Sequence, residues 1–208
     1  MPFPFRRAGL PLALLLLCGT QGTADAEVIA RKSFSYFDIR GNTADELDAA
    51  LNARGPQIGG ASSHHPAATR IRFGGEATYV ERGGRCYIGD VKVTVDTDII
   101  LPRWRDRRHA EKRLPAVWDM LLADIKRHEA RHVEIARDHA YLLEQTILAL
   151  GPAWSCDRLQ DEVGRATERA IEQHDEAQAR FDAAEATNFE NRVRRMNGSG
   201  NSAQSAGR

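Results

Sequence analysis

Residues 128–132 read His-Glu-Ala-Arg-His and match the HExxH pattern. Two histidines four residues apart lie one turn apart on the same face of a helix, so His128 and His132 can bind one Zn²⁺ together. Glu129, next to the first histidine, can then accept a proton from a zinc-bound water. The segment therefore predicts metal-assisted hydrolysis of an amide such as a peptide bond.

A long amphipathic helix is predicted around this motif, from about residue 115 to residue 150. Its apolar side chains recur at helical spacing and place His128, Glu129 and His132 at or beside the apolar face. These apolar residues are Trp118, Leu122, Ile125, Ala136, Leu143 and Ile147. Burying three ionisable groups is costly unless each has a partner, and a metal with its water would supply partners. The alternative is a pair of core histidines that hydrogen-bond to neighbouring groups.

A catalytic zinc usually has three protein ligands and one open position, so a third ligand is needed. Asp138 and His139 would lie about 9–10 Å along the helix axis from His132, which is too far for a shared metal. His64 and His65 fall in a polar loop rich in glycine and serine, and we expect them at the surface. The third ligand should therefore come from another element.

A second helix, predicted over residues 157–188, is the element best placed to supply this ligand. If it packs antiparallel to the first helix, counting outward from the turn between them places His174 opposite His132. His174 is the predicted third ligand. Because this register is defined only to about one turn, Glu168 and Glu172 remain alternatives.

The N-terminus has the form of a signal peptide over residues 1–26. Arg6 and Arg7 precede an apolar run at residues 10–17, and residues 24–26 (Ala-Asp-Ala) form an A-x-A cleavage site. Cleavage at that site would deliver the mature chain to the periplasm or outside the cell. No later stretch is long and apolar enough to span a bilayer, so we expect no transmembrane segment in the mature chain.

Removal of this leader leaves two cysteines, Cys86 and Cys156. In an oxidising compartment, two cysteines are best interpreted as one disulfide, not as metal ligands or a nucleophile. The bond would connect the region before the HExxH helix to the turn that follows it. The alternative is a pair of unpaired buried thiols.

The order of the predicted elements indicates an α+β fold in a single domain over residues 27–190. Three strands are predicted, over residues 28–39, 71–81 and 85–100. Gly83 and Gly84 indicate a hairpin, and a capping box at Thr43–Glu46 opens a short helix between the first two strands. We expect a small antiparallel sheet and a short N-terminal helix, followed by two long antiparallel helices. Residues 191–208 end in a Gly/Ser/Asn-rich stretch and are predicted to be disordered.

Several of these features together resemble a bacterial family known as predicted secreted zinc-dependent proteases, a domain-of-unknown-function family placed in the zincin-like peptidase MA clan. They are Pro102-Arg103-Trp104, Trp118, the HEARH segment, Cys86, Cys156 and the N-terminal strand with its capped helix. The resemblance spans roughly residues 28–190 and implies a zincin-like fold, with His128 and His132 as zinc ligands and Glu129 as the catalytic base. Relatives tend to end with an aromatic-Asp segment leading to Thr-His-Gly, whereas no histidine follows Phe181-Asp182 here.

The predicted function is that of a secreted zinc metallopeptidase acting on a peptide or protein substrate. Basic and acidic side chains balance at 29 each, and no basic stripe with interleaved aromatics is present, so nucleic-acid binding is not indicated. Two alternatives remain open. One is a catalytically inactive zincin-like protein that binds a cell-envelope partner, and the other is a structural protein whose HExxH string is accidental.

Overall fold

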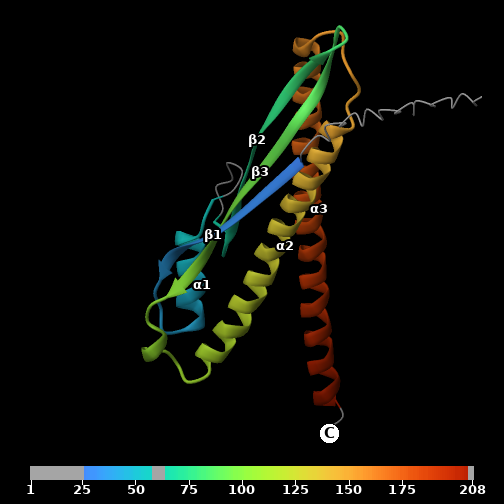
Figure 1. The fold of residues 1–208 in the computed structure, drawn as a ribbon. Helices are drawn as coiled ribbons and strands as arrows, with labels where there is room; N and C mark the ends of the chain where they lie inside the picture. The colour runs from blue at the N-terminus through green and yellow to red at the C-terminus, as the bar shows by residue number, and fades with distance from the viewer. Residues whose placement is uncertain (1–25, 58–63, 206–208) are drawn as a thin grey trace, which may run out of the picture.

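The computed structural model describes residues 26–57 and 64–205 and has the α+β class predicted from the sequence (Figure 1). The predicted signal peptide, except for Ala26, lies outside the described residues. The strands are β1 (Ala26–Ile39), β2 (Ala68–Arg82) and β3 (Arg85–Trp104). The helices are α1 (Ala44–Arg54), α2 (Leu114–Leu148) and α3 (Cys156–Ser205), with a short 3-10 turn, η1 (Arg107–His109), before α2.

The three strands form one mixed sheet with β3 in the centre, in the order β1-β3-β2. The hairpin between β2 and β3 is confirmed. Gly83 and Gly84 have φ values of 59° and 72°, which residues with a Cβ rarely adopt. The prediction of an antiparallel sheet is wrong for β1, which runs parallel to β3 with Ile39 beside Trp104.

The position of α1 explains the parallel pairing. β1 ends and β2 begins near the same end of β3, since Ile39 pairs with Trp104 and Ala68 pairs with Ile100. The segment with α1 carries the chain across this end of the sheet, from one edge to the other. The two edge strands therefore run in opposite directions, and only β2 is antiparallel to β3.

The start of α2 is anchored by a tryptophan pair at this end of the sheet. Trp104 of β3 and Trp118 of α2 have ring centroids 5.6 Å apart and are buried together with Ile39 and two leucines of α1. The Trp104 indole donates a hydrogen bond of 2.9 Å to the Gly41 carbonyl, so its polar atom is satisfied. This cluster fixes the N-terminal half of α2, ten residues before His128.

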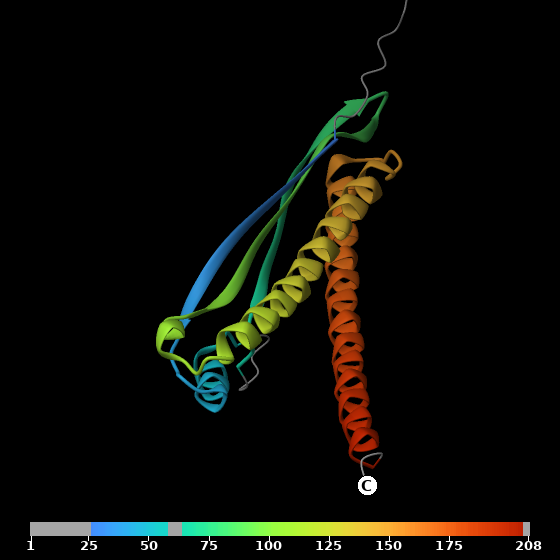
Figure 2. The same ribbon diagram turned by 90° about the horizontal axis from the view of Figure 1, so that it is seen from below.

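The C-terminal half of α2 packs along one face of the sheet (Figure 2). Alternate valines of β3 meet a stripe of α2 residues spaced three or four apart. The members of this core are Val91, Val93, Val95, Ala136, Ala140, Leu143 and Ile147. Burial of each valine side chain stabilises the fold by roughly 1.5–3 kcal/mol. The segment that carries the HExxH motif is thus held by packing on both sides.

The ends of β1 and β3 are also joined by ion pairs at Asp38. Arg103 and Arg105 donate to its two oxygens at 2.7 and 2.8 Å, and these bonds lower the pKa of Asp38 from 3.8 to about 2. A carboxylate with a lowered folded pKa contributes stability above its unfolded pKa, and loses it as the pH falls toward the folded value. We expect Asp38→Asn to lower the urea midpoint at about pH 7 and to have a smaller effect at about pH 2.5. An equal effect at both pH values would contradict this assignment.

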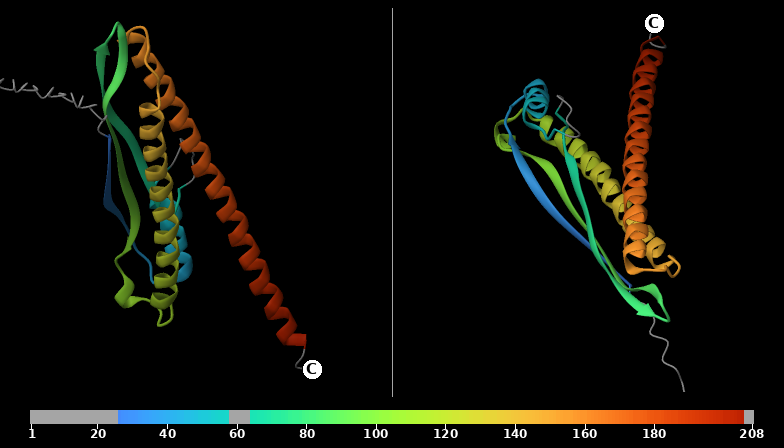
Figure 3. Two further views of the ribbon diagram at one scale, coloured as in Figure 1. Left: turned by 45° about the vertical axis from the view of Figure 1, so that its right-hand side comes forward. Right: turned by 90° about the horizontal axis from the view of Figure 1, so that it is seen from above.

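The two long helices are antiparallel and are joined at the hairpin end of the sheet. They lie together near their connection, and the C-terminal part of α3 stands away from α2 (Figure 3). The predicted disulfide is confirmed, because Cys86 of β3 is bonded to Cys156 at the start of α3. Cys86 and Ala153 also exchange two backbone hydrogen bonds of 2.9 Å, so the connection is held to the sheet over several residues.

This disulfide should contribute much of the stability of the fold. The two cysteines are separated by 70 residues, and a cross-link over such a loop restricts the unfolded chain by about 4 kcal/mol in the chain-entropy model. We expect the double variant Cys86→Ala, Cys156→Ala to lose a free energy of unfolding of that order in urea titrations. Reductant should lower the stability of the wild type equally and leave the variant unchanged. A wild type insensitive to reductant would contradict the prediction.

α3 is longer than the sequence predicted. It continues to Ser205. The sequence predicted that the helix ends at residue 188 and that residues 191–208 form a disordered tail. Residues 184–196 contain neither proline nor glycine and include alanine, glutamate and arginine, which favour helix, so no local signal ends the helix there. Residues 206–208 lie outside the described residues.

Candidate metal centre

α2 places His128 and His132 one turn apart on the side that faces α3. Their ring centroids are 4.8 Å apart, and their Nε2 atoms lie 3.1 Å from one another. The His132 side chain is 13% exposed and that of His128 is 32% exposed, so both rings lie at the border between core and solvent. Two imidazole nitrogens directed at one point are the arrangement that the HExxH spacing predicts.

α3 brings a third group to the same point. Asp182 Oδ1 lies 3.3 Å from His128 Nε2 and 3.1 Å from His132 Nε2. In the described part of the chain, this trio is a group of His, Asp, Glu or Cys side chains close enough to share a metal ion. The side chain of Asp182 is 54% exposed, so the group is open to solvent on this side.

The spacing of these three atoms fits a tetrahedral zinc ion. With bonds of about 2.0–2.1 Å to nitrogen or carboxylate oxygen, two tetrahedral ligands stand about 3.3 Å apart. The three edges measured between His128, His132 and Asp182 are 3.1, 3.3 and 3.1 Å. The donor set of two imidazoles and one carboxylate is also one that zinc accepts in catalytic sites. The residues present therefore fit the ion.

Phe181 covers one side of this group. Its ring centroid is 4.9 Å from that of His128 and 5.1 Å from that of His132. An apolar ring at this distance keeps water away from part of both imidazoles and restricts their rotation. Phe181 and Asp182 are thus adjacent in sequence and act on the same pair of rings, one by packing and the other by charge.

Glu129 lies on the inner side of α2 and is 5% exposed. The Thr69 hydroxyl of β2 donates a 2.8 Å hydrogen bond to its Oε2. Burial raises the pKa of Glu129, while the bond from Thr69 and the electrostatic influence of His132 and His128 oppose this shift. A carboxylate with a raised pKa is a stronger base than one in water, as a general base requires.

Residues 34–190 match the model of a family described as "Bacterial protein of unknown function (DUF922)". The chain belongs to this family. The match includes every residue of the candidate centre, and it confirms the bacterial family of unknown function that the sequence resembles. The description of DUF922 states no activity, so the zincin-like fold and the protease activity implied by the resemblance stay proposals. No curated protein and no solved structure matches the chain.

His174, the predicted third ligand, lies outside the group of three in this DUF922 protein. It is on α3 two turns before Asp182, 4% exposed, and packs edge-on against Phe73 at 4.9 Å. Its Nδ1 donates to Asp175 at 2.9 Å, and its Nε2 lies 2.8 Å from the amide nitrogen of Gln178. Burial lowers the pKa of His174, so the neutral ring is favoured. His174 therefore lies behind the candidate centre.

The register of α3 explains this difference. The sequence-based prediction counted equal numbers of residues outward from the turn at residues 151–155 along both helices. In the structure, the connection extends beyond the end of α2 toward the hairpin, where Cys156 is bonded to Cys86 (Figure 1). α3 therefore starts closer to the hairpin than α2 ends. As a result, Gln178 and not His174 lies opposite His132. The sequence contains one signal for Asp182, the Phe181-Asp182 pair, but that pair alone does not identify a metal ligand.

The other candidates from the sequence do not join the group. Glu168 and Glu172 are exposed on α3 and lie closer to its start. The Nδ1 atom of His139 hydrogen-bonds to the carbonyl of its own helix one turn earlier. His64 and His65 are only partly exposed, and neither is among the described residues that could share a metal.

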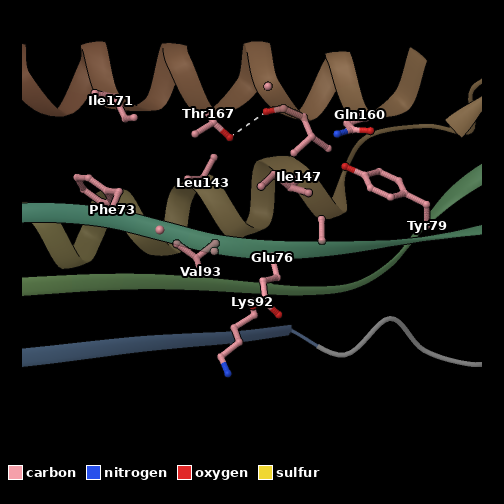
Figure 4. A pocket seen from close by; sticks show the side chains of 15 residues that line it. Phe73, Glu76, Tyr79, Lys92, Val93, Leu143, Ile147, Gln160, Thr167 and Ile171 are labelled. Atoms are coloured by element: carbon pink, nitrogen blue, oxygen red, sulfur yellow. Dashed lines mark hydrogen bonds between the residues drawn. The ribbon is translucent and has the colours of Figure 1, made fainter. Parts of the chain in front are cut away.

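A separate apolar pocket of about 400 Å³ lies between β2, α2 and α3 (Figure 4). Leu143 and Ile147 form one wall, and α3 contributes Ile171 on the opposite side. The lining includes Phe73, whose ring also contacts His174, but none of the three candidate ligands. The pocket and the candidate centre are therefore neighbouring but distinct features of this family member.

Proposed function

We propose that this protein is an exported zinc-dependent hydrolase that cleaves peptide bonds. The observation that supports this most strongly is the triangle formed by His128, His132 and Asp182 beside a buried glutamate. Three protein ligands leave one zinc position open for water or substrate, as in catalytic sites. The peptide substrate follows from the resemblance to zinc-dependent proteases and from the HExxH motif.

Glu129 would act as the general base. Zinc in such a site supplies Lewis acidity, which polarises a carbonyl group and lowers the pKa of water. Glu129 is close enough to both histidines for their charge to affect its pKa. Its carboxylate is therefore suited to take a proton from water near the two rings and to return it to the leaving amine. The hydrogen bond from Thr69 holds the carboxylate in one orientation, and burial strengthens it as a base.

Export is supported by the disulfide. Disulfides persist in oxidising compartments and are rare in the cytosol of most organisms, so Cys86–Cys156 is compatible with an extracellular or periplasmic location. Among the described residues, no helix has the length and hydrophobicity that crossing a membrane requires. The leader predicted over residues 1–26 would supply the route.

Metal analysis and a hydrolysis assay test the proposal. We expect purified protein to bind about one zinc per chain and to cleave an unfolded protein substrate such as casein. A chelator should abolish cleavage, and added zinc should restore it. Protein that takes up no zinc after incubation with the metal would contradict the proposal, and its HExxH string would then be accidental.

The sequence after Phe181-Asp182 favours a second candidate, an inactive zincin-like protein that binds a partner in the cell envelope. The histidine that tends to follow this pair in relatives is absent. This candidate predicts one bound zinc without hydrolysis of any substrate in a broad peptide library. Zinc-dependent cleavage of a single library member would exclude it.

A further inference from the structure

The side chain of Gln178 connects the candidate centre to the rest of α3. Gln178 lies one turn after His174 and one turn before Asp182, so all three residues share the face of α3 that is directed at α2. It is partly buried and makes three contacts within hydrogen-bonding range. Two are with His132, and the third is with His174.

The orientation of this amide is fixed by the groups around it. Its Nε2 lies 3.1 Å from the His132 carbonyl oxygen, which can only accept a hydrogen bond. The same nitrogen lies 2.8 Å from His174 Nε2, and the amide group has two N–H donors to serve both. The opposite orientation would set two oxygens against each other, so Gln178 Oε1 is the atom that faces His132 Nδ1.

This orientation determines which ring nitrogen of His132 carries the proton. An amide oxygen accepts only, so Nδ1 of His132 must carry the hydrogen that it donates to Gln178. In a neutral ring, Nε2 then keeps its lone pair, and this atom lies 3.1 Å from both His128 Nε2 and Asp182 Oδ1. A histidine must present such a lone pair in order to bind a metal.

We propose that Gln178 is a positioning residue that holds His132 in the Nδ1-protonated tautomer and aims its Nε2 at the point shared with His128 and Asp182. The inference rests on the proposed function in one respect, namely that this point is the position of a zinc ion. Metal-binding histidines generally donate their second ring nitrogen to a carboxylate, a carbonyl or water, and here a glutamine amide serves that purpose. His174 supports the amide in turn, because its Nδ1 donates to Asp175 and its Nε2 is free to accept.

The experiment compares wild-type protein with Gln178→Met, which keeps the length of the side chain but removes both polar atoms. In metal-free protein, ¹⁵N NMR of labelled histidine should place the His132 proton on Nδ1 in the wild type. In Gln178→Met we expect the proton to move to Nε2, where the Asp182 carboxylate can accept it. Zinc affinity should fall by about 10–100-fold, as for other groups that orient a metal ligand.

Two further variants make the test specific. Gln178→Glu keeps an acceptor for His132 Nδ1 and should retain the wild-type tautomer, although its second oxygen faces the His132 carbonyl and should lower the stability of the fold. Gln173→Ala alters an exposed glutamine on the same helix and should change neither the tautomer nor the zinc affinity. An unchanged tautomer in Gln178→Met, or equal zinc affinity in the two proteins, would overturn the inference. If the wild type bound no zinc, the proposed function would fail, but the tautomer in metal-free protein would still decide what Gln178 does.

Discussion

Glu129→Gln is expected to reduce peptide hydrolysis by about 10²–10⁴-fold while leaving zinc binding unchanged, because general-base catalysis typically contributes that factor. Glutamine has nearly the same shape and can still accept the hydrogen bond from Thr69, so the packing of α2 on β2 is preserved. It cannot take a proton from water. The measurement is kcat at saturating substrate, with zinc content determined on the same preparation.

The stability of this variant provides a second readout. Burial raises the pKa of Glu129, which means that the folded protein disfavours the ionised form relative to the unfolded chain. Glutamine removes that cost, so the variant should melt at the same temperature as the wild type or higher near neutral pH. Glu134→Gln, at an exposed position on the same helix, is the matched control and should keep full activity. Retained hydrolysis in Glu129→Gln would refute the assigned role.

The part of the candidate site that the sequence predicted lies within one helix. The spacing of apolar residues placed Glu129 and His132 on or beside the buried face of α2, and the structure confirms this, since Glu129 is 5% exposed. The hairpin at Gly83–Gly84 and the short capped helix were predicted equally well. Each of these features depends on residues a few positions apart, whose geometry the backbone fixes.

The features that the sequence did not predict depend on contacts between distant segments. The parallel pairing of β1 with β3 follows from where α1 crosses the end of the sheet, and no residue within β1 specifies it. The register of α3 against α2 depends on how far the connection reaches before Cys156 bonds to Cys86. A difference of one turn there replaces His174 by Gln178 opposite His132.

The identity of the third ligand leads to the second large effect that we expect. Asp182→Ala should weaken zinc binding by more than about 100-fold, since the loss of a group that only orients a ligand already costs about 10–100-fold. The side chain of Asp182 is 54% exposed, so its removal leaves no cavity in the core and the variant should fold normally. His174→Gln should lower the affinity by no more than about 100-fold, because His174 acts through Gln178.

These two variants separate the sequence-based and structure-based assignments of the third ligand. If His174 were the ligand, its replacement would remove zinc and Asp182→Ala would retain it. The reverse order is expected here, because the Asp182 oxygen lies within 3.3 Å of both imidazole nitrogens, whereas the His174 ring is occupied by Asp175 and Gln178. Zinc affinity from competition with a chromophoric chelator decides between them. Circular dichroism on each protein verifies that α2 and α3 are intact, so that a loss of zinc reports on the missing ligand.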